Sequence, residues 1–426
     1  MALVVQKYGG TSLASSELIL GAARRVVERR RTGASVVVVV SAMGDTTDGL
    51  VRLGQAVSRC PAPRELDRLL GTGETASAAL LAMAIDDLGW TAVSLDGGEA
   101  GIRTNDVHNN ARIVEVRTQR LRHELAAGRV VVVTGFQGKD SQGELTTLGR
   151  SGSDTSAVAL AAALGADQCE IFTDVDGVFS SDPRIVAGAR LLGRLRLEEM
   201  EELAWQGGRV VKAEAVELAR DSGVSLWVGA ASGEGAGTWM ETGPEETFRP
   251  RRPPVSGVSA RRDLIRITVP EDLSSERRKG LLDSLAAYDL IFVRGSETGA
   301  LELYVSIEEI PAPEELRREL PERWGACVET SELLGAVSLV GFGLGSRPAA
   351  LAAALSELRA LGSDGRPLEV LATFSSRESF SFVLPVAAVA PAMERLHRAF
   401  LEELPWVPPA AAGDGADERL PGSVES

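Results

Sequence analysis

The chain has 426 residues, 44% of them hydrophobic, and a net charge of −15. This length exceeds one ordinary hydrophobic core, so two or three domains are expected. The acidic balance argues against nucleic acid as the main partner, because phosphate backbones attract basic surfaces. The longest apolar runs, such as residues 36–40, have the length of a strand and are too short to span a bilayer.

The first half of the chain alternates short apolar strands with longer amphipathic helices. Strands are expected at 2–8, 35–41, 92–95, 129–134, 170–173 and 225–229. Helices are expected at 15–31, 48–58, 63–88, 114–127, 153–164, 197–205 and 210–221. The uninterrupted valine run within 35–41 is typical of a strand buried on both faces of a parallel sheet. This alternation predicts an α/β sandwich with a mostly parallel central sheet.

Residues 233–254 change in character, because glycine, proline and charge dominate them, and they predict a linker. Two βαββα units of about 70 residues each follow, which is typical of small ferredoxin-like modules. The expected strands are 264–269, 290–294, 301–307, 336–341, 368–374 and 379–384, and the expected helices are 274–287, 312–323, 349–361 and 391–403. The predicted organisation is a catalytic domain (1–232), a linker (233–254), two modules (255–332 and 333–404) and a disordered tail (405–426).

The three cysteines, Cys60, Cys169 and Cys327, are odd in number and far apart. That pattern argues against a disulfide framework and for a reducing compartment. Met1 leads directly into a strand-like segment, without the pattern of a signal peptide, so a cytoplasmic protein is expected. The three histidines are scattered too, and no metal-ligand cluster is predicted.

Lys7 begins the motif Lys-Tyr-Gly-Gly-Thr-Ser, where the first expected strand gives way to the first helix. Glycines there let the backbone approach a ligand, and a helix start offers N–H groups to an anion. Only four of the 45 basic residues are lysines, so a lysine beside a glycine turn is a candidate phosphate ligand. The spacing is not that of a Walker loop. Nucleotide binding and a bare turn are near-even interpretations of this motif alone.

Two further segments carry polar side chains next to expected strands and helices. The segment Ser-Ala-Met-Gly-Asp-Thr-Thr-Asp (41–48) follows the second strand at its carboxyl end, where open α/β sheets bind ligands. The segment Gly-Thr-Gly-Glu (71–74) is expected to precede a helix. Glu74 could hold a substrate ammonium, or could be an acid favoured by the dipole at a helix start.

A second glycine turn, Thr-Leu-Gly-Arg-Ser-Gly-Ser-Asp (147–154), opens another helix. Arg150 can grip a carboxylate with two hydrogen bonds, and Asp154 can hold lysines in register. The acidic run from Thr173 to Arg184 could bind calcium, but it lacks the EF-hand spacing. Two glycine turns, hydroxyl-rich loops and an acid–arginine pair make a phosphoryl-transfer site plausible, since that chemistry depends on positioning and charge neutralisation.

These segments, in this order, resemble the aspartate kinases of the amino-acid-kinase superfamily across residues 2–230. The matching segments are KYGGTS, SAMGDTTDGL, RTNDVHNNARI, GFQG, TTLGRSGSDTSAVALAAALGADQCEI, TDVDGVFSSDPRIV and LEEMEELAWQGGRVV. The resemblance implies a three-layer αβα amino-acid-kinase fold, followed by paired ACT modules. It also implies that a short strand at about 255–260 joins the second module, so that the two modules are interleaved.

The resemblance further implies the residues of the site. The implied catalytic residues are Lys7, Asp154 and Arg150. The implied ATP-binding residues are Lys7, Tyr8, Gly9, Gly10, Ser41, Thr173, Asp174, Phe179, Ser180, Arg184 and Arg209. The implied aspartate-binding residues are Ser41, Thr47, Glu74, Arg150, Ser151 and Gly152. Mg²⁺ would arrive with ATP, with few or no direct protein ligands, and the product would be an acyl phosphate that enters lysine, threonine and methionine synthesis.

The chain departs from the family pattern in a few places. Ser151 stands where a glycine is usual, Phe179 where a tyrosine is usual, and Arg209 where a lysine is usual, with Lys212 one turn further on. Neither C-terminal unit keeps the proline–glycine pair of an ACT effector turn, which predicts weak or lost feedback by lysine or threonine. The alternatives are a kinase for another acidic amino acid and a weakly active homologue that serves as an interaction partner. A homodimer or higher homo-oligomer is expected.

Overall fold

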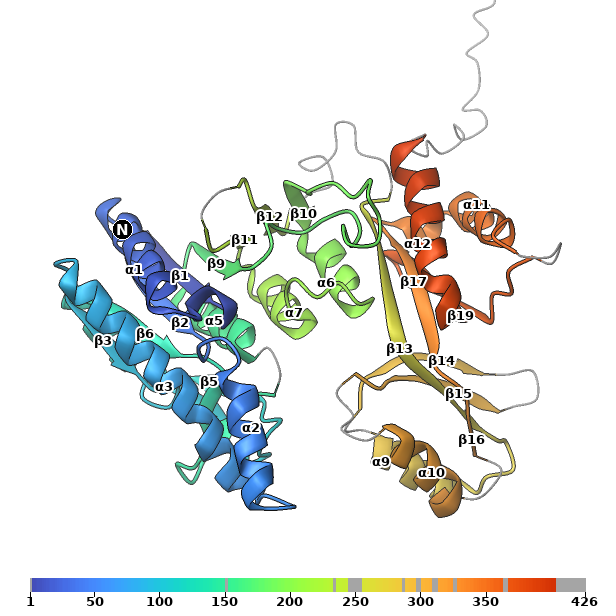
Figure 1. Cartoon of the computed structure of the whole chain (residues 1–426), viewed down its shortest axis with the longest axis horizontal. Helices are drawn as coiled ribbons and strands as arrows, with labels where there is room; N and C mark the ends of the chain where they lie inside the picture. Colours follow the sequence, from blue (N-terminus) through green and yellow to red (C-terminus); the bar gives the residue numbers. More distant parts are fainter. Residues whose placement is uncertain are drawn as a thin grey trace, which may run out of the picture.

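The computed structural model describes residues 2–149, 152–232, 235–243, 255–285, 288–295, 300–308, 313–324, 328–362 and 367–403. The chain forms one large sheet in its N-terminal half and a second in its C-terminal half (Figure 1). Within the described ranges, no helix combines the length and the apolar character needed to cross a membrane. The predicted disordered tail and residues 244–254 of the predicted linker lie outside these ranges.

The N-terminal sheet has eight strands in the order β10-β12-β11-β9-β1-β2-β6-β3. Its strands are β1 (Leu3–Tyr8), β2 (Ser35–Val40), β3 (Ala92–Leu95), β6 (Val130–Thr134), β9 (Gln168–Thr173), β10 (Arg194–Arg196), β11 (Leu226–Ala230) and β12 (Thr238–Glu241). Every pair is parallel except β11 with β12, which confirms the predicted mostly parallel sheet. Strand β1 lies between β2 and β9, so Lys7 is near the middle of the sheet.

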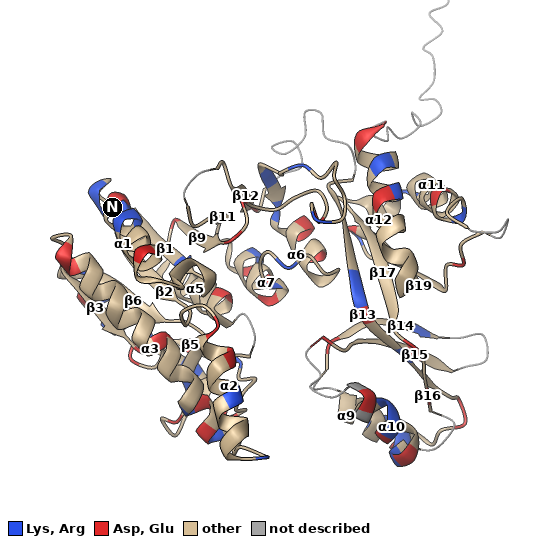
Figure 2. Cartoon of the chain, in the orientation of Figure 1, with Lys and Arg blue, Asp and Glu red and all other residues tan. Residues whose placement is uncertain are grey.

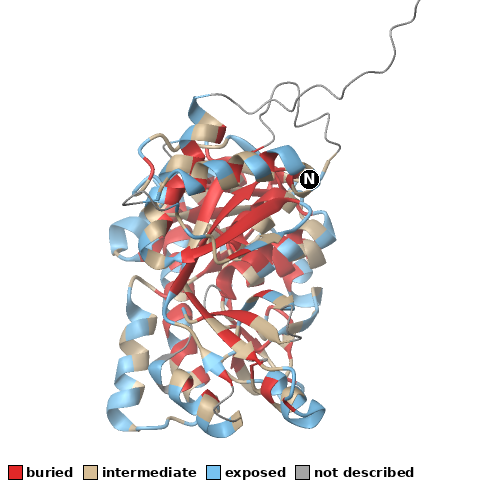
Figure 3. Cartoon of the chain, turned by 90° about the vertical axis from the view of Figure 1, so that its right-hand side faces the viewer, coloured by how far each residue is buried: buried red, intermediate tan, exposed pale blue. Residues whose placement is uncertain are grey.

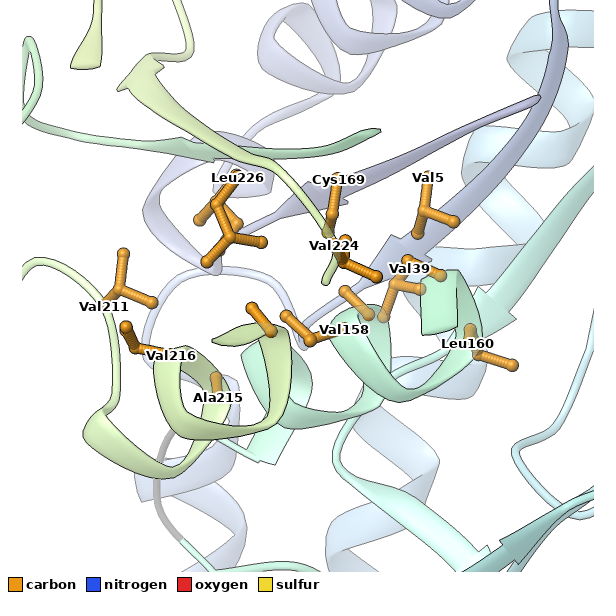
Figure 4. Close-up of a cluster of buried hydrophobic side chains, with 14 of the residues drawn as sticks. Val5, Val39, Val158, Leu160, Cys169, Val211, Ala215, Val216, Val224 and Leu226 are labelled. Carbon is orange, nitrogen blue, oxygen red and sulfur yellow. The ribbon is translucent and has the colours of Figure 1, made fainter. Parts of the chain in front are cut away.

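Helices cover both faces of this sheet. Successive valines of β2 point to opposite sides, so both faces are apolar and each packs against helices. Val36 and Val38 pack with residues of α1 (Ser16–Arg31) and α3 (Pro63–Asp87). Val37 and Val39 pack on the other side, with α5 (Gly152–Leu164) and α7 (Ala213–Ser222), as Figure 4 shows for Val39. The remaining helical elements of this half are η1 (Thr11–Leu13), α2 (Thr46–Val57), α4 (Gln119–Ala126) and α6 (Leu197–Trp205).

A separate four-stranded sheet, ordered β5-β4-β7-β8, lies within the N-terminal half. Its strands are β4 (Ile102–Thr104), β5 (Ile113–Val116), β7 (Gln137–Lys139) and β8 (Leu145–Thr147). The prediction of one helix over 114–127 is wrong, since β5 occupies its start and α4 begins only at Gln119. The β-branched run at 113–116 favours a strand, and β4 supplies the partner that a local pattern does not reveal.

The C-terminal half forms a second sheet in the order β14-β15-β13-β17-β19-β18, with β16 paired to β13. Its strands are β13 (Gly257–Val269), β14 (Leu290–Gly295), β15 (Leu301–Ser306), β16 (Glu329–Thr330), β17 (Leu334–Val340), β18 (Ala372–Ser375) and β19 (Ser379–Pro385). Its helices are α9 (Ser275–Leu285), α10 (Pro313–Trp324), α11 (Pro348–Arg359) and α12 (Val389–His397), with short turns η2 (Leu344–Ser346), η3 (Val386–Ala388) and the π-helical η4 (Arg398–Glu402).

Strand β13 runs through both C-terminal units. Residues 257–261 pair with β17 of the second unit, and residues 264–269 pair with β15 of the first unit. The sequence predicts two separate strands here, but they form one strand with an irregularity between Arg261 and Leu264. The pairing of residues 257–261 with β17 is the arrangement that interleaved units would have.

The predicted linker contains a strand of the first sheet. Strand β12 pairs with β11, and its alternate residues Thr238 and Met240 are fully buried. The alternation of buried and less buried residues in β12 covers only four residues, and the glycines and prolines around it favour a linker over a strand. The N-terminal sheet therefore extends beyond residue 232 to at least Glu241.

Helix α6 packs against the C-terminal sheet through buried polar contacts. The Glu199 carboxylate is 4% exposed and accepts a hydrogen bond from the Phe342 N–H at 3.2 Å. The Ser338 hydroxyl donates to the Gln206 side-chain oxygen at 3.0 Å. In Figure 3 the buried residues concentrate on the strands, while the outer faces of the helices are exposed.

Candidate active site

The carboxyl ends of β2, β1 and β9 meet at the motif that begins with Lys7. The Gly9 N–H donates to the Phe172 carbonyl of β9 at 3.2 Å, and the Ser41 N–H donates to the Tyr8 carbonyl at 3.1 Å. This end of an open α/β sheet is where ligands bind. The 7–12 and 41–48 segments therefore meet at one edge of the sheet.

Gly10 occupies a place that has no room for a side chain. A Cβ atom there would lie 2.8 Å from the Ala42 carbonyl oxygen. The Gly10 carbonyl in turn accepts a hydrogen bond from the Gly44 N–H at 2.9 Å. Any larger residue would push the two loops apart, so the close approach of their backbones explains the glycine. The Gly9 N–H donates to Phe172 and is not available to an anion. The charged residue of this motif that could bind an anion is Lys7.

Lys7 and Asp154 form a buried ion pair. The Lys7 Nζ lies 2.7 Å from the Asp154 Oδ1, and the two side chains are 12% and 7% exposed. Asp154 lies in the first turn of α5, where the helix dipole favours a negative charge. In Figure 2 charged residues lie mainly on helices and loops, and β1, β2 and β6 are largely free of them. The structure thus brings together two predicted catalytic residues, Lys7 of β1 and Asp154 of α5, as a buried charge pair.

Glu74 lies in the interior of α3, so its alternative role as a helix-start acid is wrong. Its carboxylate is 3% exposed, and its Oε1 accepts a hydrogen bond from the Ala42 N–H at 3.1 Å. Its Oε2 is buried without a hydrogen-bond partner among the described residues. Burial raises the pKa of Glu74 to about 7, and the backbone hydrogen bonds only partly offset that effect. An unpartnered buried carboxylate oxygen is suited to receive a cation.

The close approach of α3 to the 41–48 segment places Glu74 there. A Cβ atom on Gly73 would lie 2.8 Å from the Ala42 Cβ, so a glycine in the middle of this helix is required by contact. A glycine inside a helix destabilises it by about 1 kcal/mol relative to alanine, which the contact must offset. The sequence predicts that Gly71 and Gly73 precede a helix, but both lie inside α3, and the contact with Ala42 explains why residue 73 is a glycine.

The predicted acceptor-side residues Ser41, Thr47 and Gly152 lie on three neighbouring elements. The Ser41 hydroxyl donates to the Ser153 hydroxyl at 2.9 Å, which joins the loop after β2 to the start of α5. Thr47 lies in the first turn of α2, and Gly152 is the first residue of α5. Arg150 and Ser151 lie outside the described residues, so their roles stay predictions.

The side chain of Tyr8 belongs to the core. Its ring is fully buried and stacks on Phe172 with 4.7 Å between ring centroids. Its hydroxyl donates to the Gln6 side-chain oxygen at 3.3 Å, and burial raises its pKa. Only the backbone of Tyr8 lies at the sheet edge, so the structure does not bring its phenol to a ligand.

The predicted nucleotide residues after β9 lie on the loop that leads to β10. The Thr173 hydroxyl donates to the Asp174 carboxylate at 3.0 Å, at the carboxyl end of β9. Phe179 is half-buried and forms an isolated bridge with Leu191. Arg184 is 87% exposed and pairs with Asp182 at 2.8 Å. The hydrogen bonds that Arg184 donates lower the pKa of Asp182. Thr173 ends β9 and the others lie on the loop after it, where Arg184 and Arg190 are both exposed cations.

Two predicted ATP-binding residues contact the C-terminal half instead. Ser180 is buried, and its hydroxyl lies 2.9 Å from the His397 Nε2 of α12. The other ring nitrogen of His397, Nδ1, lies 2.7 Å from the Glu402 carboxylate. Arg209 pairs with Glu308 at 3.0 Å. The sequence did not predict that His397, a fully buried histidine, would meet the 174–192 loop.

A family model described as the amino acid kinase family matches residues 2–230. An aspartokinase of Bacillus sp. (strain MGA3) is 42% identical over 410 residues, which are 94% of this chain and 97% of that protein. An aspartokinase of Corynebacterium efficiens is 43% identical over 371 residues, 84% of this chain and 88% of that protein. The chain therefore belongs to the amino acid kinase family and, within it, to the aspartokinases.

The solved structures agree on the fold. Escherichia coli aspartokinase III, in complex with aspartate and ADP, aligns with a TM-score of 0.78 at 23% identity and covers 93% of this chain and 99% of that one. An aspartate kinase from Synechocystis aligns with a TM-score of 0.53 at 34% identity, covering 94% of this chain and 69% of that one. The two-sheet arrangement described above is thus one that aspartokinases share.

Proposed function

We propose that this chain transfers the γ-phosphoryl group of ATP to the side-chain carboxylate of L-aspartate, giving 4-phospho-L-aspartate and ADP. Glu74 is the structural observation that carries the proposal. Its buried Oε2, which has no hydrogen-bond partner in the part of the chain that the structure describes, belongs to a carboxylate bonded to the 41–48 loop and would meet the ammonium of an amino-acid acceptor. A charge-assisted hydrogen bond of that kind is strong in a buried setting.

The transfer needs positioning and charge neutralisation rather than a base, because the acceptor carboxylate is already deprotonated. One of its oxygens attacks the γ-phosphorus, and a new O–P bond forms while the bond to the β–γ bridging oxygen breaks. ADP leaves with that electron pair. Lys7, held by Asp154, would neutralise the charge on the phosphate oxygens, and Arg150 would hold a carboxylate of the acceptor.

The nucleotide would lie along the loop that follows β9, with Thr173, Asp174, Phe179 and Arg184 around it. Mg²⁺ would enter bound to the phosphate oxygens and neutralise part of their charge. Lys7 and Asp154 would lie beside the transferring phosphate. Lys7 would attract the phosphate oxygens, and Asp154 would attract the accompanying cation. The assignment of the nucleotide to this loop is supported by its place at the carboxyl end of β9.

The reaction is tested by incubating the protein with Mg-ATP and hydroxylamine, which traps an acyl phosphate as a hydroxamate. Hydroxamate is expected with aspartate. A signal with another acidic amino acid but not with aspartate would support a sister kinase, and no signal with any acid would support a role as an interaction partner.

Arg150→Ala is expected to lower hydroxamate formation by about 10²-fold or more, because it removes a bidentate grip on the acceptor. The measurement is kcat/KM for aspartate under the same trapping conditions. Arg184→Ala, which removes an exposed cation of the nucleotide loop, should chiefly alter the KM for ATP. If the Arg150→Ala protein kept the wild-type kcat/KM, Arg150 would not bind the acceptor, and the proposed acceptor site would be wrong.

Weak or absent feedback is proposed for the C-terminal half, which would be a pair of ACT modules. The Gly343 N–H at the η2 turn donates to the Glu378 carboxylate at 2.6 Å, so this backbone group is engaged within the chain. Lysine and threonine at millimolar concentration should each lower activity by less than about twofold, as expected when an effector lacks differential affinity for two states. Stronger inhibition by either amino acid would contradict the proposal.

Further assignments follow from kinship with aspartokinases and from the sequence. We propose that the chain acts in the cytoplasm and catalyses the entry step to lysine, threonine and methionine synthesis or to a specialised pathway. We also propose a homodimer or higher homo-oligomer assembled through the C-terminal units. Light scattering of the purified chain tests the last of these directly.

A further inference from the structure

Helix α3 carries a second buried carboxylate on the same side as Glu74. Asp67 and Glu74 are seven residues apart, which is about two helical turns, so both project from one face of α3. Asp67 is fully buried. A buried position in a helix is typical of a structural residue. The hydrogen-bond partners of Asp67, however, are His108 and Asn109 of one segment and Thr147, which precedes the second glycine turn.

Three groups on two segments converge on Asp67. The Thr147 hydroxyl donates to its Oδ1 at 2.5 Å, and the His108 Nδ1 lies 2.6 Å from its Oδ2. The Asn109 N–H lies 3.1 and 3.2 Å from the two oxygens. Asn109 has a φ of +65°, a left-handed conformation that a non-glycine residue adopts at some energetic cost. Asp67 therefore holds a strained residue of one segment and the last residue of β8 in the other.

The two segments are also bonded to each other and to α3. The Ala111 N–H donates to the Thr147 carbonyl at 2.8 Å. One turn along the helix, the Gln137 side chain of β7 donates to the Gly71 carbonyl at 3.2 Å. The face of α3 between Asp67 and Glu74 is thus fixed on the four-stranded sheet. Any shift of α3 relative to β8 would move Glu74 relative to the glycine turn that follows Thr147.

We propose that Asp67 is a positioning residue of the acceptor site, which fixes Glu74 relative to the end of β8. This inference rests on the proposed aspartate kinase function. Asp67 itself touches no substrate, and its effect passes through α3 and Thr147. A displacement of about 1 Å at reacting groups can lower a rate about 10²-fold, so a buried hydrogen-bonded anchor of this kind has a measurable effect. The effect should fall on aspartate and spare ATP.

The first test is Asp67→Asn, with separate KM values for aspartate and ATP. The amide keeps one acceptor oxygen but turns an NH₂ group toward a donor, so the KM for aspartate should rise by about tenfold. The KM for ATP should stay within about twofold. Asp140→Asn is the matched control, because Asp140 is also buried and accepts N–H bonds from Gln142 and Glu144 in a turn next to the same small sheet. Its loss should leave both constants within about twofold.

A pair of variants at Thr147 covers the case in which Asp67→Asn fails to fold. Thr147→Val removes the donated hydroxyl and should raise the KM for aspartate by about threefold or more, while Thr147→Ser keeps the donor and should restore it. Equal changes in both KM values, or no selective change in any folded variant, would overturn the role of Asp67 alone. A wild-type chain that neither phosphorylates nor binds aspartate would overturn the proposed function and this inference with it.

Discussion

Lys7→Met should lower kcat by about 10³-fold or more, because it removes the cation proposed to neutralise the transferring phosphate. It should also destabilise the fold by about 3–5 kcal/mol, since the substitution leaves the buried Asp154 carboxylate without its partner. Both effects have one origin, which is that the ion pair of Lys7 and Asp154 lies almost entirely out of water. Measurements of kcat and of urea-induced unfolding would report them separately.

A double variant separates catalysis from stability at this pair. Lys7→Met combined with Asp154→Asn removes both charges and should recover most of the lost stability, because neutral replacements of a buried ion pair are often tolerated. It should remain inactive. Lys139→Ala is the matched control, since Lys139 forms a partly exposed pair with Asp96 at 3.0 Å. That change should affect stability by about 1 kcal/mol or less and leave kcat unchanged. An active double variant would show that Lys7 is structural only.

Glu74→Gln should abolish most activity and yet stabilise the protein at pH 8. Burial raises the pKa of Glu74 to about 7 in the folded chain, from an ordinary value of 4.5. The folded state therefore holds this proton more tightly than the unfolded state does. Its contribution to stability is complete below about pH 4.5 and is lost as the pH rises through about 7. At pH 8 the glutamine should stabilise by up to about 3 kcal/mol, because it removes a buried charge.

The pH dependence of the wild-type chain checks the same group. The value of kcat/KM for aspartate should rise through about pH 7, as Glu74 ionises and becomes able to bind the substrate ammonium. Glu124→Gln provides the contrast. Burial opposes ionisation of Glu124, but the Arg129 hydrogen bond and the charges of Arg120 and Arg129 outweigh it and lower its pKa. That substitution should destabilise the fold at pH 8, and stabilisation by both glutamines would contradict the reasoning.

The parallel sheet and the place of the ligand-binding edge could be predicted from the sequence. Continuous valine runs identify β2 and β6, because a strand buried on both faces is composed mainly of apolar residues. The glycine motifs mark where backbones approach each other, as Gly10 does at Ala42. Local patterns carry this information, so one sequence suffices to find it.

The rest depends on contacts between distant segments. Strand β5 exists because β4 pairs with it, and β13 is continuous because β15 and β17 flank its two ends. The helical pattern does not mark Asp67 as a site residue, because its partners lie on distant segments, and its spacing of seven from Glu74 is the signal that the sequence offers. Ser180 matches a nucleotide motif by position, while its hydroxyl is directed to His397, more than 200 residues away in the chain. No local periodicity reports such partners.

Strand β13 belongs to both units of the C-terminal half, so a cut between the units breaks its pairing. A chain cut after residue 332 would keep residues 257–261 of β13 but lose β17, the strand that pairs with them. The exposed edge would carry free N–H and C=O groups and invite association with other chains. Neither C-terminal unit can therefore be deleted, transplanted or exchanged by recombination as a separate module, and any chimera should take residues 255–403 as one block.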